Sequence, residues 1–107
     1  MADVLTGKGY LVTASLAAAL TAGSTETITI IGCQVSNVHN STASWLTAHI
    51  NRSGGVDTEL CHQLSIPVND AFNPVQNKIV LNPNDALEFQ AENASSLEAS
   101  ISYLVQT

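Results

Sequence analysis

The stretch Leu97–Gln106 reads LEASISYLVQ, and apolar residues occupy every second position in it. A period of two is typical of a β-strand that buries one face and exposes the other. In a helix of the same length these side chains would not share one side. The sequence therefore predicts a half-buried final strand, whose buried residues are Leu97, Ala99, Ile101, Tyr103 and Val105.

Two further strands are predicted just before this one, around residues 79–81 and 87–91. In the second of them Leu87, Phe89 and Ala91 alternate with polar residues. The segment Pro-Asn-Asp at 83–85 predicts a tight turn between the two strands, because all three residue types favour turns. The last third of the chain is therefore expected to form three strands separated by two turns.

Residues 25–38 predict a longer strand with one irregularity. Ile28 and Ile30 share a face, and beside Gly32 the apolar residues change to the opposite phase. Such a change predicts either a β-bulge or a strand that crosses from one sheet to another. The residues of the second phase are Ile31, Cys33 and Val35.

The remaining segments complete an all-β pattern. Residues 1–20 are expected to form an extended N-terminal segment, although the composition of 16–20 favours a helix. A strand around 46–50 is followed by a turn at 51–55, a strand that ends at Pro67, and a loop at 68–76 anchored by Phe72. The inward residues of these two strands are predicted to be Leu46, Ala48 and Ile50, and Leu60, Leu64 and Ile66.

About six to eight short strands at roughly ten-residue spacing are typical of a β-sandwich or a small barrel. No segment of the sequence predicts a helix convincingly, and 107 residues are enough for one hydrophobic core but not for two. The sequence therefore predicts a single antiparallel β-sandwich or jelly-roll-like domain that spans residues 1–107.

The charge composition excludes several partners. Charged residues make up 11% of the chain, and the net charge of −6 includes only three cations, Lys8, Arg52 and Lys78. Three scattered cations do not form a nucleic-acid footprint, so no direct nucleic-acid binding is expected. The longest apolar run is far too short to span a membrane, and the N-terminal residues do not resemble a signal peptide. Synthesis and folding in a cytoplasm are expected, with a mostly neutral polar surface suited to lateral packing.

Residues that could carry chemistry are few. His39, His49 and His62 lack the spacing of metal ligands, and no phosphate loop, nucleophile elbow or cofactor motif is present, so no metal and no cofactor are expected. A carboxylate pair at i and i+2 is more typical of a solvated strand edge than of a catalytic site. Without a secretion signal, two cysteines are expected to be reduced. The carboxylate pair is Asp57 and Glu59, and the two cysteines expected to be reduced are Cys33 and Cys61.

Trp45 is a candidate interface residue. If Leu46 and its alternating partners face the core, then Trp45, Thr47 and His49 face the other way. An outward tryptophan in a chain with 5% aromatics is a candidate binding anchor. A register different by one residue would bury Trp45 instead. The predicted interface residues are Trp45, Thr47, His49 and Phe72, and no catalytic residue is predicted.

Four segments resemble the small β-sandwich structural proteins of tailed-bacteriophage particles: LTGKGYL at 5–11, IGCQVSN at 31–37, IPV at 66–68 and IVLNPNDALEFQA at 79–91. In such proteins a strand, a turn of the Pro-Gly-Asp type and a strand with alternating Leu and Ala lead into a terminal strand like that of residues 97–103. Asn84 stands where glycine is usual, and asparagine also adopts positive φ.

This resemblance implies a virion protein without enzymatic activity, made in the host bacterial cytoplasm. The expected role is that of a capsid decoration or cement protein that binds the major capsid protein on the assembled head, as a homo-oligomer such as a dimer or trimer. A neck, tail or fibre component is similar in kind. The alternatives from other classes are a carbohydrate- or receptor-binding sandwich that uses Trp45 and His49, and a small hydrolase.

Overall fold

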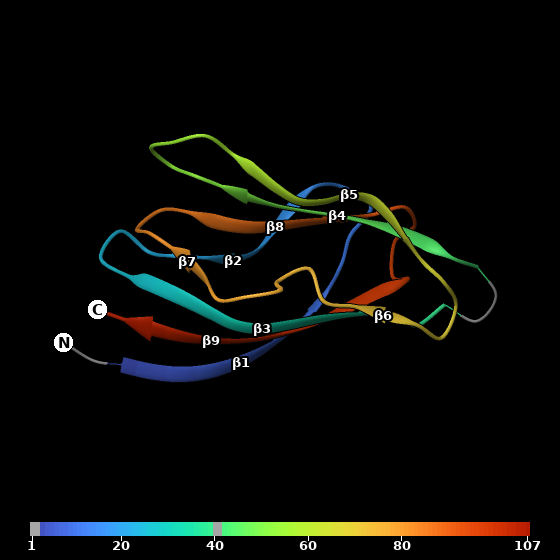
Figure 1. The fold of residues 1–107 in the computed structure, drawn as a ribbon, viewed down its shortest axis with the longest axis horizontal. Coiled ribbons are helices and arrows are strands. Elements are labelled where there is room, and N and C mark those ends of the chain that lie inside the picture. The colour runs from blue at the N-terminus through green and yellow to red at the C-terminus, as the bar shows by residue number, and fades with distance from the viewer. Residues whose placement is uncertain (1–2, 40–41) are drawn as a thin grey trace.

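The computed structural model describes residues 3–39 and 42–107, which form two antiparallel β-sheets packed face to face (Figure 1). The five-stranded sheet has the order β1-β9-β3, and both β6 and β7 pair with β3; the four-stranded sheet has the order β2-β8-β4-β5. The all-β sandwich prediction is confirmed. The strands are β1 (Asp3–Leu11), β2 (Ala17–Thr21), β3 (Thr27–Asn37), β4 (Ser44–Asn51), β5 (Thr58–Ile66), β6 (Ala71–Phe72), β7 (Ile79–Leu81), β8 (Ala86–Ala91) and β9 (Leu97–Gln106).

Residues 3–21 contribute one strand to each sheet, and residues 1–2 of the expected extended segment lie outside the described residues. β1 pairs with β9 along its whole length, and β2 pairs with β8 in the opposite layer. The alanine-rich run at 16–20 is therefore a strand rather than a helix. Ala19 and Leu20 are buried in the core, and this tertiary burial outweighs the helix propensity of the run.

The core lies between the two sheets. β9 contributes Leu97, Ala99 and Ile101, all buried as predicted, whereas Tyr103 and Val105 are half-buried against the core. Exposure no longer alternates at this end, because Leu104 on the outer side lies between Leu5 and Thr29 and is also half-covered. β4 and β8 supply the opposite wall with Leu46, Ala48, Ile50, Leu87, Phe89 and Ala91.

The phase change in β3 is a β-bulge. The register of β3 against β9 shifts between Ile30 and Gly32, so that Ile28, Ile30, Cys33 and Val35 all face the core. Ile31 was predicted to share the phase of Cys33 and Val35, and this was wrong, since it is 44% exposed. The extra residue of the bulge takes up the change in phase, and its side chain lies outside the sandwich.

β5 departs most from the predicted pattern. Its register against β4 shifts twice, and Gln63 has a φ of 48°, in the left-handed region. Leu60 is half-buried and Ile66 is buried, but Leu64 is 38% exposed, so the prediction of one buried face was wrong for Leu64. β5 is an edge strand, and Leu64 pairs with Leu46 at the open side of the sheet, where no further strand covers it.

The predicted turn at 83–85 is confirmed, with Asn84 at a φ of 69°. Asp85 holds this turn to the β4–β5 hairpin: its carboxylate accepts hydrogen bonds from Arg52 Nη1 at 2.8 Å and from the backbone N–H groups of Ser53 and Asn82. Burial of the carboxyl raises its pKa, but these hydrogen bonds outweigh that effect and the pKa lies below the ordinary value for aspartate.

Candidate functional site

The outer face of the five-stranded sheet is largely uncharged and partly apolar. Leu5, Leu104, Thr29 and Val80 are successive cross-strand neighbours on β1, β9, β3 and β7, so their side chains form one row across the sheet. Leu5 is 70% exposed and Val80 is 44% exposed. Such a row is available to a partner, because its apolar atoms are in contact with water.

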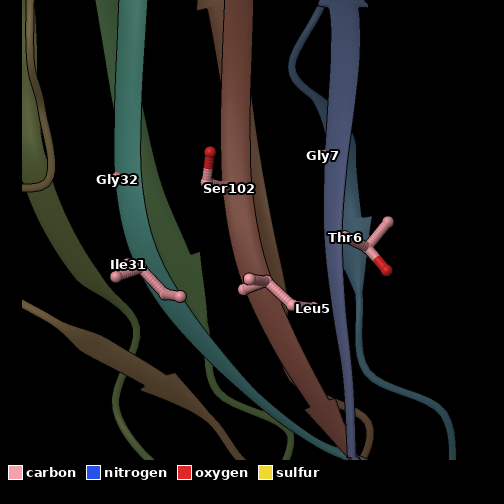
Figure 2. Close-up of a pocket in the computed structure, with 6 residues that line it drawn as sticks. All are labelled: Leu5, Thr6, Gly7, Ile31, Gly32 and Ser102. Atoms are coloured by element: carbon pink, nitrogen blue, oxygen red, sulfur yellow. The ribbon is translucent and has the colours of Figure 1, made fainter.

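An open hollow adjoins this row (Figure 2). Its floor consists of Gly7, Ser102 and Gly32, three small residues that pair with one another across β1, β9 and β3. Leu5 and the bulged Ile31 rise beside the floor, and Figure 2 shows the Leu5 side chain reaching over β9. The hollow exists because two glycines and a serine lie side by side where larger side chains would fill the surface.

The chemistry of the hollow favours binding over catalysis. Its six lining residues, which include Thr6, carry no charge, and their only side-chain polar groups are two hydroxyls, those of Thr6 and Ser102. It contains no acid, base or thiol that could activate a nucleophile. What the hollow can do is accept an apolar side chain, with the Ser102 hydroxyl and the backbone available for hydrogen bonds, whereas the Thr6 side chain points away from it (Figure 2).

The outer face of the four-stranded sheet is acidic by contrast. His49 has Glu59 and Glu88 as its cross-strand neighbours, and its Nε2 lies 2.5 Å from Glu88 Oε1. A second pair joins His62 Nδ1 and Glu59 Oε2 at 2.8 Å. The two faces of the sandwich thus offer different surfaces, one apolar and neutral and the other rich in carboxylates.

The structure places three of the four predicted interface residues on the acidic face. Trp45 is half-buried and lies outside the core cluster. Thr47 is 8% exposed, and its Oγ1 accepts a hydrogen bond from the backbone N–H of Gln63 at 3.0 Å, which ties it to the irregular part of β5. His49 is engaged by Glu88, which leaves Trp45 as the member of this group with apolar surface to offer.

Phe72 lies apart from this group, in the other sheet. It pairs with Val35 of β3, and because directly opposite residues share a face, it is directed toward the core, against which it packs. The interface role of the four residues stays a prediction, and the structure does not bring them together on one surface.

The histidine, cysteine and acidic side chains that could carry chemistry do not gather at one site among the described residues. Among the residues that the structure describes, no group of three or more His, Cys, Asp or Glu side chains could hold a metal ion. Burial raises the pKa of the Cys33 thiol to about 12, and burial also raises the pKa of Cys61, whose Sγ lies 3.5 Å from the carbonyl oxygen of Leu46. Both cysteines are free thiols. Asp57 Oδ1 accepts a hydrogen bond from the backbone of Arg52.

The hollow was not predicted from the sequence, although two signals for it are present. Gly7 and Gly9 are unusual in a strand, and glycine in a strand marks a place where backbone is left uncovered. The change of phase at Gly32 also implies that one apolar residue turns outward, and that residue is Ile31. No helix in the described part of the chain has the length and apolar character needed to cross a membrane.

Neither a protein-family model nor a curated protein matches this sequence. Among solved structures, the chain is similar to one in the acidic stable capsid structure of Helicobacter pylori bacteriophage KHP30, with a TM-score of 0.53 and 9% identity over 98% of this chain and 87% of that one. A chain of the infectious bursal disease virus Gt strain gives a TM-score of 0.40 and 9% identity, over 98% of this chain and 30% of that one. The protein therefore shares its fold with a chain of a bacteriophage capsid.

Proposed function

We propose that the protein is a non-enzymatic virion structural protein, a decoration or cement protein that binds the outside of an assembled phage capsid and fastens neighbouring major capsid proteins. The observation that carries this proposal is the neutral outer face of the five-stranded sheet, with its apolar row and open hollow. The shared fold with a phage capsid chain over 98% of the length supports a virion role. A neck, tail or fibre position would use the same surface.

The proposed mechanism is burial of apolar surface against the shell. The fully buried centre of a protein interface is poor in charged residues, and the face around Leu5, Ile31 and Val80 has this character. An apolar side chain of the shell would enter the hollow above Gly7 and Gly32. A contact of standard size buries roughly 1,600 Å² in total, and repetition over a symmetric shell multiplies its effect.

Particles that carry the protein are expected to release their genomes at a higher temperature than particles that lack it, and added protein should restore this resistance. A ligand that binds only the assembled shell stabilises it by about 2.7 kcal/mol per site at a concentration of 100 Kd. The measurement is heat-induced genome release, at low and high salt and with a chelator. Because the hollow and the row beside it are uncharged, salt should change the protection little. Equal release temperatures would contradict the cement role, and loss of protection with the chelator would indicate a metal site.

A substitution of Trp45 provides the second test. It distinguishes two candidate contact surfaces, the acidic face that carries Trp45 and the neutral face that carries the hollow. If Trp45 is a binding anchor, Trp45→Ala should weaken binding to particles by about 2 kcal/mol or more and leave the unfolding midpoint nearly unchanged. Leu5→Asp is the matched variant on the neutral face and should weaken binding if the hollow contacts the shell. Binding and unfolding are measured on the same preparations.

The outcomes for Trp45→Ala distinguish three functions. A large loss of stability would show that Trp45 supports the fold rather than a partner. Loss of binding to a sugar array, with particle binding intact, would favour the carbohydrate- or receptor-binding alternative, in which Trp45 stacks on a sugar beside the polar groups of His49 and Glu88. Loss of particle binding alone would assign Trp45 to the shell contact.

A further inference from the structure

Three of the four sheet edges carry features that hinder pairing with another strand. β2 has five residues and a register shift between Ala18 and Leu20. β5 has two register shifts, a left-handed Gln63 and the charged side chain of Glu59. β6 and β7 have two and three residues, and prolines lie nearby in the sequence. Short strands, bulges, charges and prolines are the usual means by which proteins prevent pairing at sheet edges.

The fourth edge, β1, is long and regular, and its charged residues are Asp3 and Lys8. Its nine residues pair with β9 without a register shift, it contains no proline, and its one acid and one base leave it without net charge. No strand of the described residues covers its other side (Figure 1). Lys8 is exposed on the inner side of β1, and its Nζ donates a hydrogen bond to the carbonyl oxygen of Ala19 in β2 at 2.7 Å, so its charge is held toward the other sheet. Val4 and Leu5 are 52% and 70% exposed.

We propose that β1 pairs antiparallel with β1 of a second copy of this chain, centred on Gly7, so that the two five-stranded sheets become one continuous sheet. A nine-residue edge is about 30 Å long and offers unpaired backbone N–H and C=O groups along its length. The inference rests on the edge alone and does not depend on the proposed function.

The register follows from the two faces of the strand. Directly opposite residues share a face, so the odd-numbered outer residues pair with odd ones and the even-numbered inner residues with even ones. With Gly7 opposite Gly7, all nine residues pair. On the inner side Val4 of one copy lies opposite Tyr10 of the other and gains an aromatic neighbour. The Tyr10 ring is itself held in place by Phe89, with a centroid separation of 6.3 Å. On the outer side Leu5 lies over Gly9, next to which the space for a Cβ is empty.

The neighbouring registers are worse for identifiable reasons. The next register that keeps each side chain on its own face shifts one strand by two residues. In one direction this places Lys8 opposite Lys8, and like charges directly opposite one another destabilise a sheet. Moving them by two residues in the other direction places Lys8 opposite Val4, so that a charged group faces an apolar side chain. A second copy is the favoured occupant because the Gly7-centred register is self-complementary: all nine residues find a partner, and the exposed Leu5 of each copy meets the open space at Gly9 of the other. The Gly7-centred register also brings the hollows of the two copies together at the dyad.

Cysteine cross-linking tests both the pairing and the register. In the Gly7-centred register, Gly7→Cys brings two thiols opposite one another, at Cβ separations of about 4.5–5.5 Å, which small shifts bring within disulfide range. Gly9→Cys is the control for register, since two residues at position 9 would be offset along the strands. Gly32→Cys is the control for position: it lies in the same cross-strand row, on β3 and away from the edge. An added Cβ meets nothing closer than 4.0 Å at any of the three positions.

Under mild oxidation of the full chain, Gly7→Cys is expected to form a disulfide-linked dimer at least tenfold faster than Gly9→Cys, Gly32→Cys or the unmodified protein with its own two cysteines. Sedimentation of the unmodified protein should show two chains of 11.2 kDa each at high concentration. Faster linkage of Gly9→Cys than of Gly7→Cys would overturn the register. A monomer at all concentrations with equal linkage rates would overturn the pairing. All measurements use free protein, so failure of the particle experiments would leave this result unaffected.

Discussion

Replacing Ile101 with alanine is expected to lower the free energy of unfolding by about 2–4 kcal/mol, because the lost side chain leaves a cavity that the neighbouring strands fill only in part. Ile101 is completely buried in the middle of β9 and lies between Lys8 of β1 and Cys33 of β3. Both neighbouring strands are held in fixed register, so the cavity has little room to collapse.

Ser100→Ala is the matched control for this prediction, since Ser100 is exposed on the outer side of the same strand. Its substitution should change stability by no more than about 0.5 kcal/mol. Urea unfolding of both variants measures the difference through the midpoint at constant slope. If Ser100→Ala proved the more destabilising of the two, the assignment of the buried face of β9 would be wrong.

Replacing Asp85 with alanine is expected to cost about 3 kcal/mol, because it leaves the Arg52 guanidinium and two backbone N–H groups without their shared acceptor. Asp85 is 3% exposed and connects the turn before β8 to the hairpin between β4 and β5. Asp57→Ala is the matched control. Asp57 is exposed and accepts one backbone hydrogen bond from Arg52, so its loss should cost less.

The same residue gives the stability a dependence on pH. The folded pKa of Asp85 lies below its ordinary value, so its contribution is fully present above the unfolded pKa, about 3.9, and is lost as the pH falls through the folded pKa. The difference in unfolding free energy between the unmodified protein and Asp85→Ala should therefore narrow below about pH 4. A difference that stays constant from pH 6 to pH 2 would show that the carboxylate charge does not contribute.

The sequence predicts most reliably where local pattern alone determines the structure. The alternation in Leu97–Gln106, the change of phase beside Gly32 and the turn at Asn84 were all recognised, because each depends on a residue and its close neighbours in the chain. The pattern of 58–66 was misread at Leu64. Two register shifts against β4 break the alternation in this edge strand, and the order of apolar and polar residues at 58–66 does not mark them.

The candidate site was harder to predict than the fold. Trp45 was singled out as a large aromatic residue with either an outward or a buried side chain, and the structure places it half-buried, outside the core cluster. The hollow depends on Gly7, Ser102 and Gly32, which come from three strands and meet only through the pairing of β1, β9 and β3. No periodicity within one segment indicates that three small residues will be neighbours. The same is true of Asp85 and Arg52, which are 33 positions apart.

The pairing of β1 with β9 has a mechanical consequence. Asp3 lies opposite Gln106, so β1 begins and β9 ends side by side at the same end of the sheet (Figure 1). A force that pulls these ends apart would act first on the last pair of the ladder and peel β1 from β9 one pair at a time, because the hydrogen bonds lie across the strands. A force applied perpendicular to the sheets would instead load both layers and the whole core at once. We therefore expect β1 and β9 to separate at a lower force when Asp3 and Gln106 are pulled apart than when the two sheets are pressed together.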